Sequence, residues 1–119
     1  MSDHPAAAAR ATRVPDGYAP AARLDALDDG ALLGVSVGGR ALCLARAGDE
    51  VTALEDRCSH SAFPLSAGDL LPDGTVRCSW HGARFDRRTG AVREGPACDP
   101  VAPYPVLVVD DVVYVRAGA

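Results

Sequence analysis

The chain has 119 residues, 48% of them apolar, which suits a single domain with a modest core. Its formal net charge of −4 argues against nucleic-acid binding, which favours a basic surface. The sequence contains no apolar run long enough for a transmembrane helix, and Ala6–Ala9 is too short for a secretory signal core. We therefore expect a cytoplasmic protein that does not enter membranes.

The N-terminal residues 1–13 are rich in alanine and lack any hydrophobic period, so we expect them to form a flexible tail. Residues 14–119 are expected to form one domain. Leu24 and Leu27 could line one side of a short helical turn, which the turn pair Asp29-Gly30 would end. No other segment has a sustained helical period.

Two hairpins are predicted from apolar runs that flank turn-forming pairs. The first joins residues 33–37 to residues 41–45 through Gly38-Gly39, and a further strand follows at 51–54. The second joins 106–109 to 112–115, and both of its arms are dominated by β-branched residues. The fold class expected from this pattern is all-β, with short antiparallel strands that close into a small sandwich or barrel.

The middle of the chain has a different character, because proline and glycine recur from Arg57 to Gly95. Turns at residues 72–74 and 88–90 bracket brief strands at 75–77 and 83–85. We interpret residues of about 56–96 as a small subdomain inserted into the β framework. Its loops are the natural place for binding chemistry, since loops held by a rigid sheet usually carry it.

Two Cys-His pairs, Cys58-Ser-His60 and Cys78-Ser-Trp-His81, are the candidate metal ligands. Each pair offers one thiolate and one imidazole, so one metal could take all four ligands or two metals could divide them. A structural zinc is the commonest use of two Cys and two His. In a zinc finger, however, Cys usually pairs with Cys, and the His residues lie on a helix. Here each loop holds one of each, and no helix follows.

The residues around these pairs resemble the Rieske family. The segments that carry the resemblance are Cys58-Ser-His60-Ser-Ala-Phe-Pro64-Leu65, Cys78-Ser-Trp-His81-Gly82, Ala83-Arg-Phe85-Asp86, Thr89-Gly90 and Gly95-Pro96-Ala97. The resemblance covers roughly residues 17–116 and implies a Rieske-type β fold with one [2Fe–2S] cluster per chain. It also implies that Cys58 and Cys78 hold one iron, and His60 and His81 the other.

Four further residues are expected around the cluster with a less direct role. Leu65 would cover it, Trp80 would shield its loop, Gly82 continues the second motif, and Pro96 belongs to a segment that resembles the family's proline loop. Cys43 alternates with Ala41 and Ala45 on a predicted strand, so we expect it in the core.

The chain departs from the family's respiratory-complex branch in two ways. Phe63 and Trp80 occupy the places of that branch's two extra cysteines, so no disulfide can join the loops. Ala83 and Phe85 stand where that branch has a serine and a tyrosine hydroxyl, and neither side chain can donate a hydrogen bond. Because such donors stabilise the reduced state, their absence predicts a low potential, roughly −150 mV.

The resemblance is closest to the ferredoxin components of bacterial aromatic-ring hydroxylating dioxygenase systems. It implies a monomeric carrier that takes single electrons from a flavin-dependent ferredoxin reductase and gives them to a terminal Rieske oxygenase in aromatic hydrocarbon catabolism. The chain itself cannot be the oxygenase, because only His4 remains to build a two-His mononuclear iron site. Two alternatives stay open: a small Rieske subunit of a nitrite-reductase-like oxidoreductase, and a zinc-stabilised β module for interaction.

Overall fold

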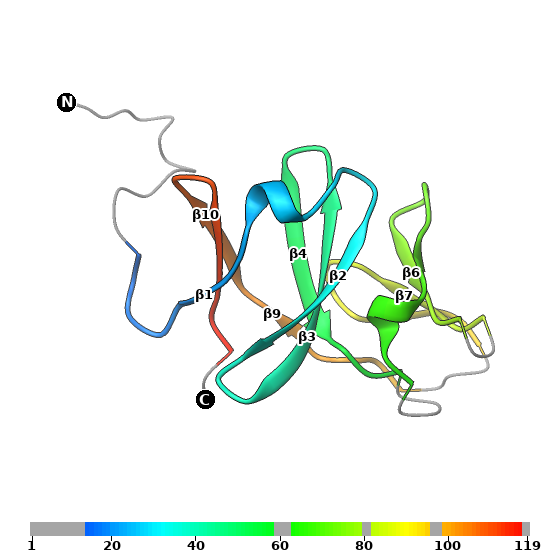
Figure 1. The fold of residues 1–119 in the computed structure, drawn as a ribbon. Helices are drawn as coiled ribbons and strands as arrows, with labels where there is room; N and C mark the ends of the chain where they lie inside the picture. Colours follow the sequence, from blue (N-terminus) through cyan, green and yellow to red (C-terminus); the bar gives the residue numbers. More distant parts are fainter. Residues whose placement is uncertain (1–13, 59–62, 80–81, 96–98, 118–119) are drawn as a thin grey trace.

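The computed structural model describes residues 14–58, 63–79, 82–95 and 99–117 (Figure 1). Within these ranges the regular structure consists of short antiparallel strands and two single 3-10 turns, which confirms the predicted all-β class. No helix in the described ranges has the length and apolar character needed to cross a membrane. The predicted tail, residues 1–13, lies outside the described residues.

The first sheet joins the two ends of the described chain, in the order β1-β11-β10. Its strands are β1 (Ala19–Arg23), β10 (Val106–Val109) and β11 (Val112–Val115). The β10–β11 hairpin has the predicted bounds. Asp110 and Asp111 form its turn with φ of 50° and 64°, a backbone shape that aspartate tolerates better than most residues.

The second sheet is the central layer, in the order β2-β3-β4-β9. Its strands are β2 (Leu32–Val37), β3 (Arg40–Ala47), β4 (Glu50–Glu55) and β9 (Pro103–Tyr104). Gly38 and Gly39 make the predicted turn between β2 and β3. The expected helical turn is shorter than the leucine spacing suggested, because it is a 3-10 turn, η1 (Leu24–Ala26), that Leu27 ends in an extended conformation.

The third sheet contains the predicted middle segment and has the order β5-β6-β7-β8. Its strands are β5 (Asp69–Leu70), β6 (Thr75–Arg77), β7 (Arg84–Asp86) and β8 (Val92–Glu94), preceded by the 3-10 turn η2 (Leu65–Ala67). Strand β6 has its predicted bounds, whereas β7 begins one residue later than expected. Ala83 lies just before β7, and its carbonyl accepts the N–H of Cys78.

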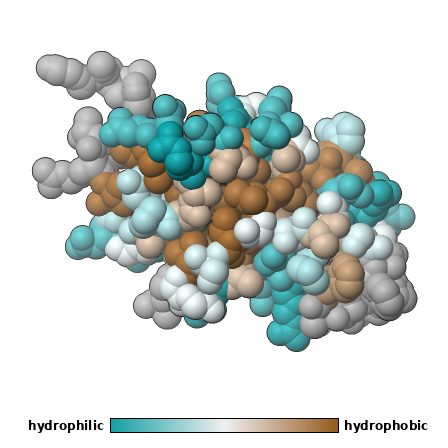
Figure 2. All heavy atoms as spheres, in the orientation of Figure 1, coloured by the Kyte–Doolittle hydropathy of each residue, from teal (hydrophilic) through white to brown (hydrophobic). Residues whose placement is uncertain are grey.

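The central sheet is buried on both faces, which explains the unbroken run of buried residues from Leu42 to Ala45 on β3. Leu42 and Leu44 face a cluster shared with the first sheet, while Cys43 faces a second cluster shared with the third sheet. Figure 2 shows apolar residues concentrated across the middle of the visible face, with hydrophilic residues around them. The third sheet thus rests on the face of the central sheet that carries Cys43.

An ionic contact also joins the central and third sheets. The Glu50 carboxylate, at the start of β4, accepts hydrogen bonds from Arg87 Nη2 at 2.9 Å and from Arg88 Nε at 2.8 Å. The Arg88 hydrogen bond is the main reason that the pKa of Glu50 lies below its usual value. Because Glu50 is 41% exposed, solvent screens this contact, and it serves mainly to orient the β7–β8 turn.

Candidate metal centre

Cys58 and Cys78 begin two loops that close in the same way. Cys58 follows β4, and its N–H donates to the carbonyl of Phe63 at 2.8 Å. Cys78 follows β6, and its N–H donates to the carbonyl of Ala83, also at 2.8 Å. Each bond joins a cysteine to the residue five positions later, so the two loops have the same closure.

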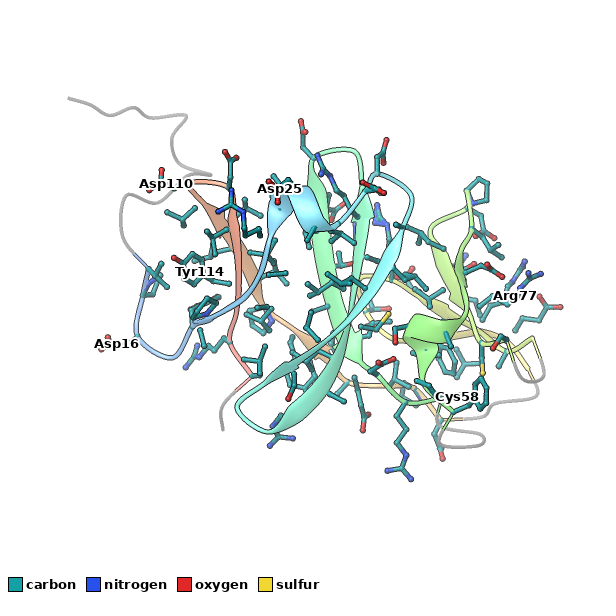
Figure 3. The ribbon with its side chains drawn as sticks, in the orientation of Figure 1. Asp16, Asp25, Cys58, Arg77, Asp110 and Tyr114 are labelled. Carbon is teal, nitrogen blue, oxygen red and sulfur yellow. The ribbon has the colours of Figure 1, made fainter. Side chains whose placement is uncertain are left out.

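Both cysteine side chains are removed from water. Cys58 and Cys78 are each 1% exposed and belong to one apolar cluster with Leu65, Ala83 and Phe85. Figure 3 shows Cys58 at the end of the molecule that lies far from Asp110 and Tyr114. Two buried cysteine sulfurs from separate loops, in dry surroundings, suit the thiolate half of a [2Fe–2S] centre.

A close backbone approach brings the two loops together. Gly68 follows η2, and a Cβ at this position would overlap the carbonyl oxygen of Arg77, the residue before Cys78. The next residue, Asp69, pairs with Arg77 across β5 and β6. Only a glycine allows this approach. Gly68 therefore lets the chain that follows η2 lie directly against Arg77, the residue before Cys78.

The structure describes two of the four residues expected around the centre. Leu65 is fully buried in the same apolar cluster as the two cysteines. Gly82 has φ of 78°, a conformation that favours glycine, and its N–H donates to the carbonyl of Cys78 at 3.0 Å. The remaining candidate residues lie outside the described residues: His60, Trp80, His81 and Pro96.

Ala83 and Phe85 are fully buried in the cluster that contains both cysteines. They carry no hydroxyl group, so their side chains offer no hydrogen bond to sulfur in this interior. The structure therefore places Ala83 and Phe85, whose lack of a hydroxyl predicts a low potential, beside the cysteine loops.

Cys43 lies in the same apolar cluster, opposite Leu54 on β4, and is 1% exposed, in agreement with its expected place in the core. Burial, and secondly the Asp56 carboxylate, raise the pKa of the Cys43 thiol far above its usual value. Cys43 is thus a neutral thiol at physiological pH, which suits packing better than metal binding.

The sequence analysis missed the hydrogen-bonded pair of Asp56 and Ser66, which flanks the first loop on both sides. The Ser66 N–H donates to Asp56 Oδ1 at 2.7 Å, and its hydroxyl donates to Oδ2 at 2.6 Å. The available signal was weak: an aspartate two residues before a candidate ligand, and a serine just after the motif. Neither indicates on its own that the two side chains meet.

Comparisons with known proteins agree with this geometry. Residues 17–105 match the Rieske [2Fe-2S] domain family. The anthranilate 1,2-dioxygenase ferredoxin subunit of Burkholderia cepacia is 41% identical over 81 residues, which cover 68% of this chain and 74% of that protein. The ferredoxin of carbazole 1,9a-dioxygenase from Nocardioides aromaticivorans IC177 superposes with a TM-score of 0.82 at 32% identity, covering 85% of this chain and 98% of that one.

A second solved structure contains an oxygenase as well as a ferredoxin. It is the complex of reduced oxygenase and oxidized ferredoxin in carbazole 1,9a-dioxygenase, and the matched chain is 29% identical with a TM-score of 0.76. The match covers 85% of this chain and 94% of that one. The paired cysteine loops, the three-sheet fold and the family match lead to one conclusion: the chain belongs to the Rieske [2Fe–2S] domain family, and its cofactor is a [2Fe–2S] cluster.

Proposed function

We propose that this protein is a ferredoxin that carries single electrons from a flavin-dependent ferredoxin reductase to a terminal Rieske oxygenase. The observation that carries this proposal is the match to dioxygenase ferredoxins along nearly their whole length, 98% of the Nocardioides chain. The whole chain has three His residues, too few for both a Rieske centre and a two-His mononuclear iron site. The protein is therefore the electron carrier of its system and not its oxygenase.

We assign the cluster to four ligands within a cluster-binding subdomain of about residues 56–96. Cys58 and Cys78 hold one iron, and His60 and His81 the other. The burial of both cysteines and the matching closure of their loops support the sulfur half of this assignment. The imidazole half rests on the sequence motifs. When bound, the cluster accepts and releases one electron, and the four side chains fix its position at one end of the molecule.

The protein is expected to work at a low potential, as a donor to an oxygenase requires. Ala83 and Phe85 keep the surroundings of the cysteines apolar and free of side-chain hydroxyl donors at these two positions. Leu65 of η2 is buried beside both cysteines, and we expect it to cover the [2Fe–2S] cluster. We further propose that residues 14–119 act as one monomeric domain in the cytoplasm, within an aromatic catabolic pathway.

The zinc alternative is set aside, because the family to which the chain belongs binds a [2Fe–2S] cluster. The nitrite-reductase-like alternative keeps the same cluster and differs only in the partner. Reconstitution separates the two remaining functions. The loaded protein is mixed with a flavin reductase and the oxygenase of an aromatic dioxygenase system, and NADH-dependent product formation is measured. Copurification with a large sirohaem subunit, without any oxygenase turnover, would contradict the proposed role.

The ligand assignment is tested on the same preparations. His60→Cys and His81→Ala should each lose the Rieske absorption and the reduced EPR spectrum, because the iron bound by two imidazoles produces that signature. An unchanged spectrum in either variant would refute the assignment of that residue.

A further inference from the structure

We propose that Asp56 is a positioning residue for the metal centre, and that its two hydrogen bonds to Ser66 hold together the described ends of the segment that carries Cys58. Asp56 lies two residues before Cys58, and Ser66 lies just beyond the end of the loop. Both carboxylate oxygens are used, since Oδ1 accepts from the Ser66 N–H and Oδ2 from the Ser66 hydroxyl. At 2.7 and 2.6 Å these are short, charge-assisted hydrogen bonds.

The two cysteine loops differ in what holds their ends together. The second loop lies between β6 and β7, and the ladder pair Arg77↔Arg84 joins its two sides directly. The first loop leaves β4 and enters the 3-10 turn η2, so no ladder joins its sides within the described residues. The Asp56–Ser66 pair takes the place of that ladder, outside the inner bond from Cys58 to Phe63.

The pair is itself fixed to the central sheet. The Asp56 N–H donates to the carbonyl of Ala41 at 2.9 Å, which extends the β3–β4 ladder by one residue. On the other side, β2 approaches so closely that a Cβ on Gly34 would lie 2.7 Å from Ser66 Oγ and 3.2 Å from Asp56 Oδ2. Because Gly34 has no side chain, it leaves the space in which the Asp56 carboxylate and the Ser66 hydroxyl meet. The pair thereby attaches the loop to the central sheet.

A second Asp pair, in the third sheet, provides a control. Asp73 Oδ1 accepts from the Thr75 N–H at 3.1 Å and from the Thr75 hydroxyl at 2.6 Å. This pair has the same two kinds of donor and lies in the turn between β5 and β6. Its second oxygen, Oδ2, lies 3.7 Å from Arg84 Nη2 in a half-exposed ion pair, a weak contact. If the loss of any such carboxylate were enough to speed cluster release, both Asp variants would release the cluster faster. If Asp56 has a specific role in holding the cluster, only its replacement will do so.

The inference deepens the proposed function, because it rests on Cys58 being a cluster ligand. Its test compares Asp56→Ala, Ser66→Ala and Gly34→Ala with Asp73→Ala in the loaded, full-length protein. Cluster release is followed as the decay of visible absorbance in the presence of an iron chelator, well below the melting temperature. Far-UV circular dichroism reports the melting of each variant, and the EPR spectrum reports the geometry of the reduced centre.

We expect Asp56→Ala to release its cluster roughly tenfold faster than the wild type, since two charge-assisted bonds are lost. Ser66→Ala and Gly34→Ala should shift the release rate in the same direction by less, because each perturbs the pair without removing the carboxylate. Asp73→Ala should change the rate by less than about twofold. Asp56→Asn removes the charge but keeps a hydrogen-bonding side chain, and we expect a rate between those of wild type and Asp56→Ala.

The outcomes separate this inference from the proposals on which it rests. If the wild type contains no iron and no acid-labile sulfide, the cluster assignment fails. If the wild type loads normally and Asp56→Ala releases its cluster no faster than Asp73→Ala, with unaltered EPR, the positioning role alone is refuted. Should Asp56→Ala fail to fold, Ser66→Ala and Gly34→Ala decide the matter by the same comparison.

Discussion

Ala83→Ser tests whether the apolar surroundings of the cysteines set the reduction potential. Ala83 is fully buried in the apolar core cluster that contains Cys58 and Cys78, and its carbonyl already accepts the Cys78 N–H. A serine hydroxyl at this position has no access to water. It therefore has to bond within the site, where sulfur atoms are the acceptors that become more negative on reduction.

The size of the effect follows from how much stronger that bond becomes on reduction. A hydrogen bond to a charged group contributes about 1.5–3 kcal/mol, and only the part that differs between the two redox states changes the potential. If that part is about 1–1.4 kcal/mol, the midpoint rises by roughly 40–60 mV, because 59 mV corresponds to a tenfold change for one electron. Phe85→Tyr adds a hydroxyl to the same group of buried apolar residues and should shift the midpoint in the same direction.

Spectroelectrochemical titration of the visible circular dichroism at neutral pH measures these midpoints. Val113→Thr is the control, because it buries a hydroxyl in the other apolar cluster, between the first and central sheets. It should lower stability by about 1–3 kcal/mol and leave the potential unchanged. A wild-type midpoint well above zero, or an Ala83→Ser midpoint at or below the wild-type value, would refute the reasoning.

Three further predictions follow from single residues. Gly68→Ala should lower the free energy of unfolding by about 1–3 kcal/mol in denaturant titrations, because its methyl group overlaps the Arg77 carbonyl; an unchanged midpoint would contradict that approach. Cys43→Ala should keep the full cluster spectrum, and loss of that spectrum would make Cys43 a ligand. Burial raises the pKa of Asp86, but the backbone N–H groups of Arg88 and Thr89, together with Arg93, outweigh it and lower the pKa overall. This stabilisation is present above the unfolded-state pKa, near 4, and is lost as the pH falls through the lower folded value, so Asp86→Asn should show a shallower acid loss of stability than wild type.

Much of the fold could be predicted because its hairpins are local. Gly38-Gly39 follows an alternating run and Asp110-Asp111 lies between β-branched runs, and the structure has both hairpins at or near the expected bounds. By contrast, β1 pairs with β11 from the opposite end of the chain, and β9 is a two-residue strand that begins with proline. Such pairings depend on tertiary contacts that no local pattern carries.

The candidate site divides in the same way. The candidate ligand motifs are sequence-local, so Cys58 and Cys78 could be named as candidates without coordinates, and Ala83 and Phe85 could be compared with the family one by one. The supporting contacts are not local: Asp56 meets Ser66 only because the loop closes, and Gly68 and Gly34 matter only for what lies opposite them. A glycine in a sequence does not say which backbone or side chain comes near it.

The charge distribution indicates that the local surroundings, more than the net charge, decide the potential. Residues 55–94 contain six of the 16 acidic residues and six of the 12 arginines, so this segment is neutral and the whole net charge of −4 lies elsewhere. Asp16 and Asp110 lie at the opposite end of the molecule from Cys58 and Arg77 (Figure 3). Exposed charges farther away than a Debye length, about 8 Å at physiological salt, are largely screened. Exposed acidic residues beyond this distance therefore contribute little to the energy of adding an electron, and the absence of hydroxyl donors at Ala83 and Phe85 remains the dominant reason to expect a low potential.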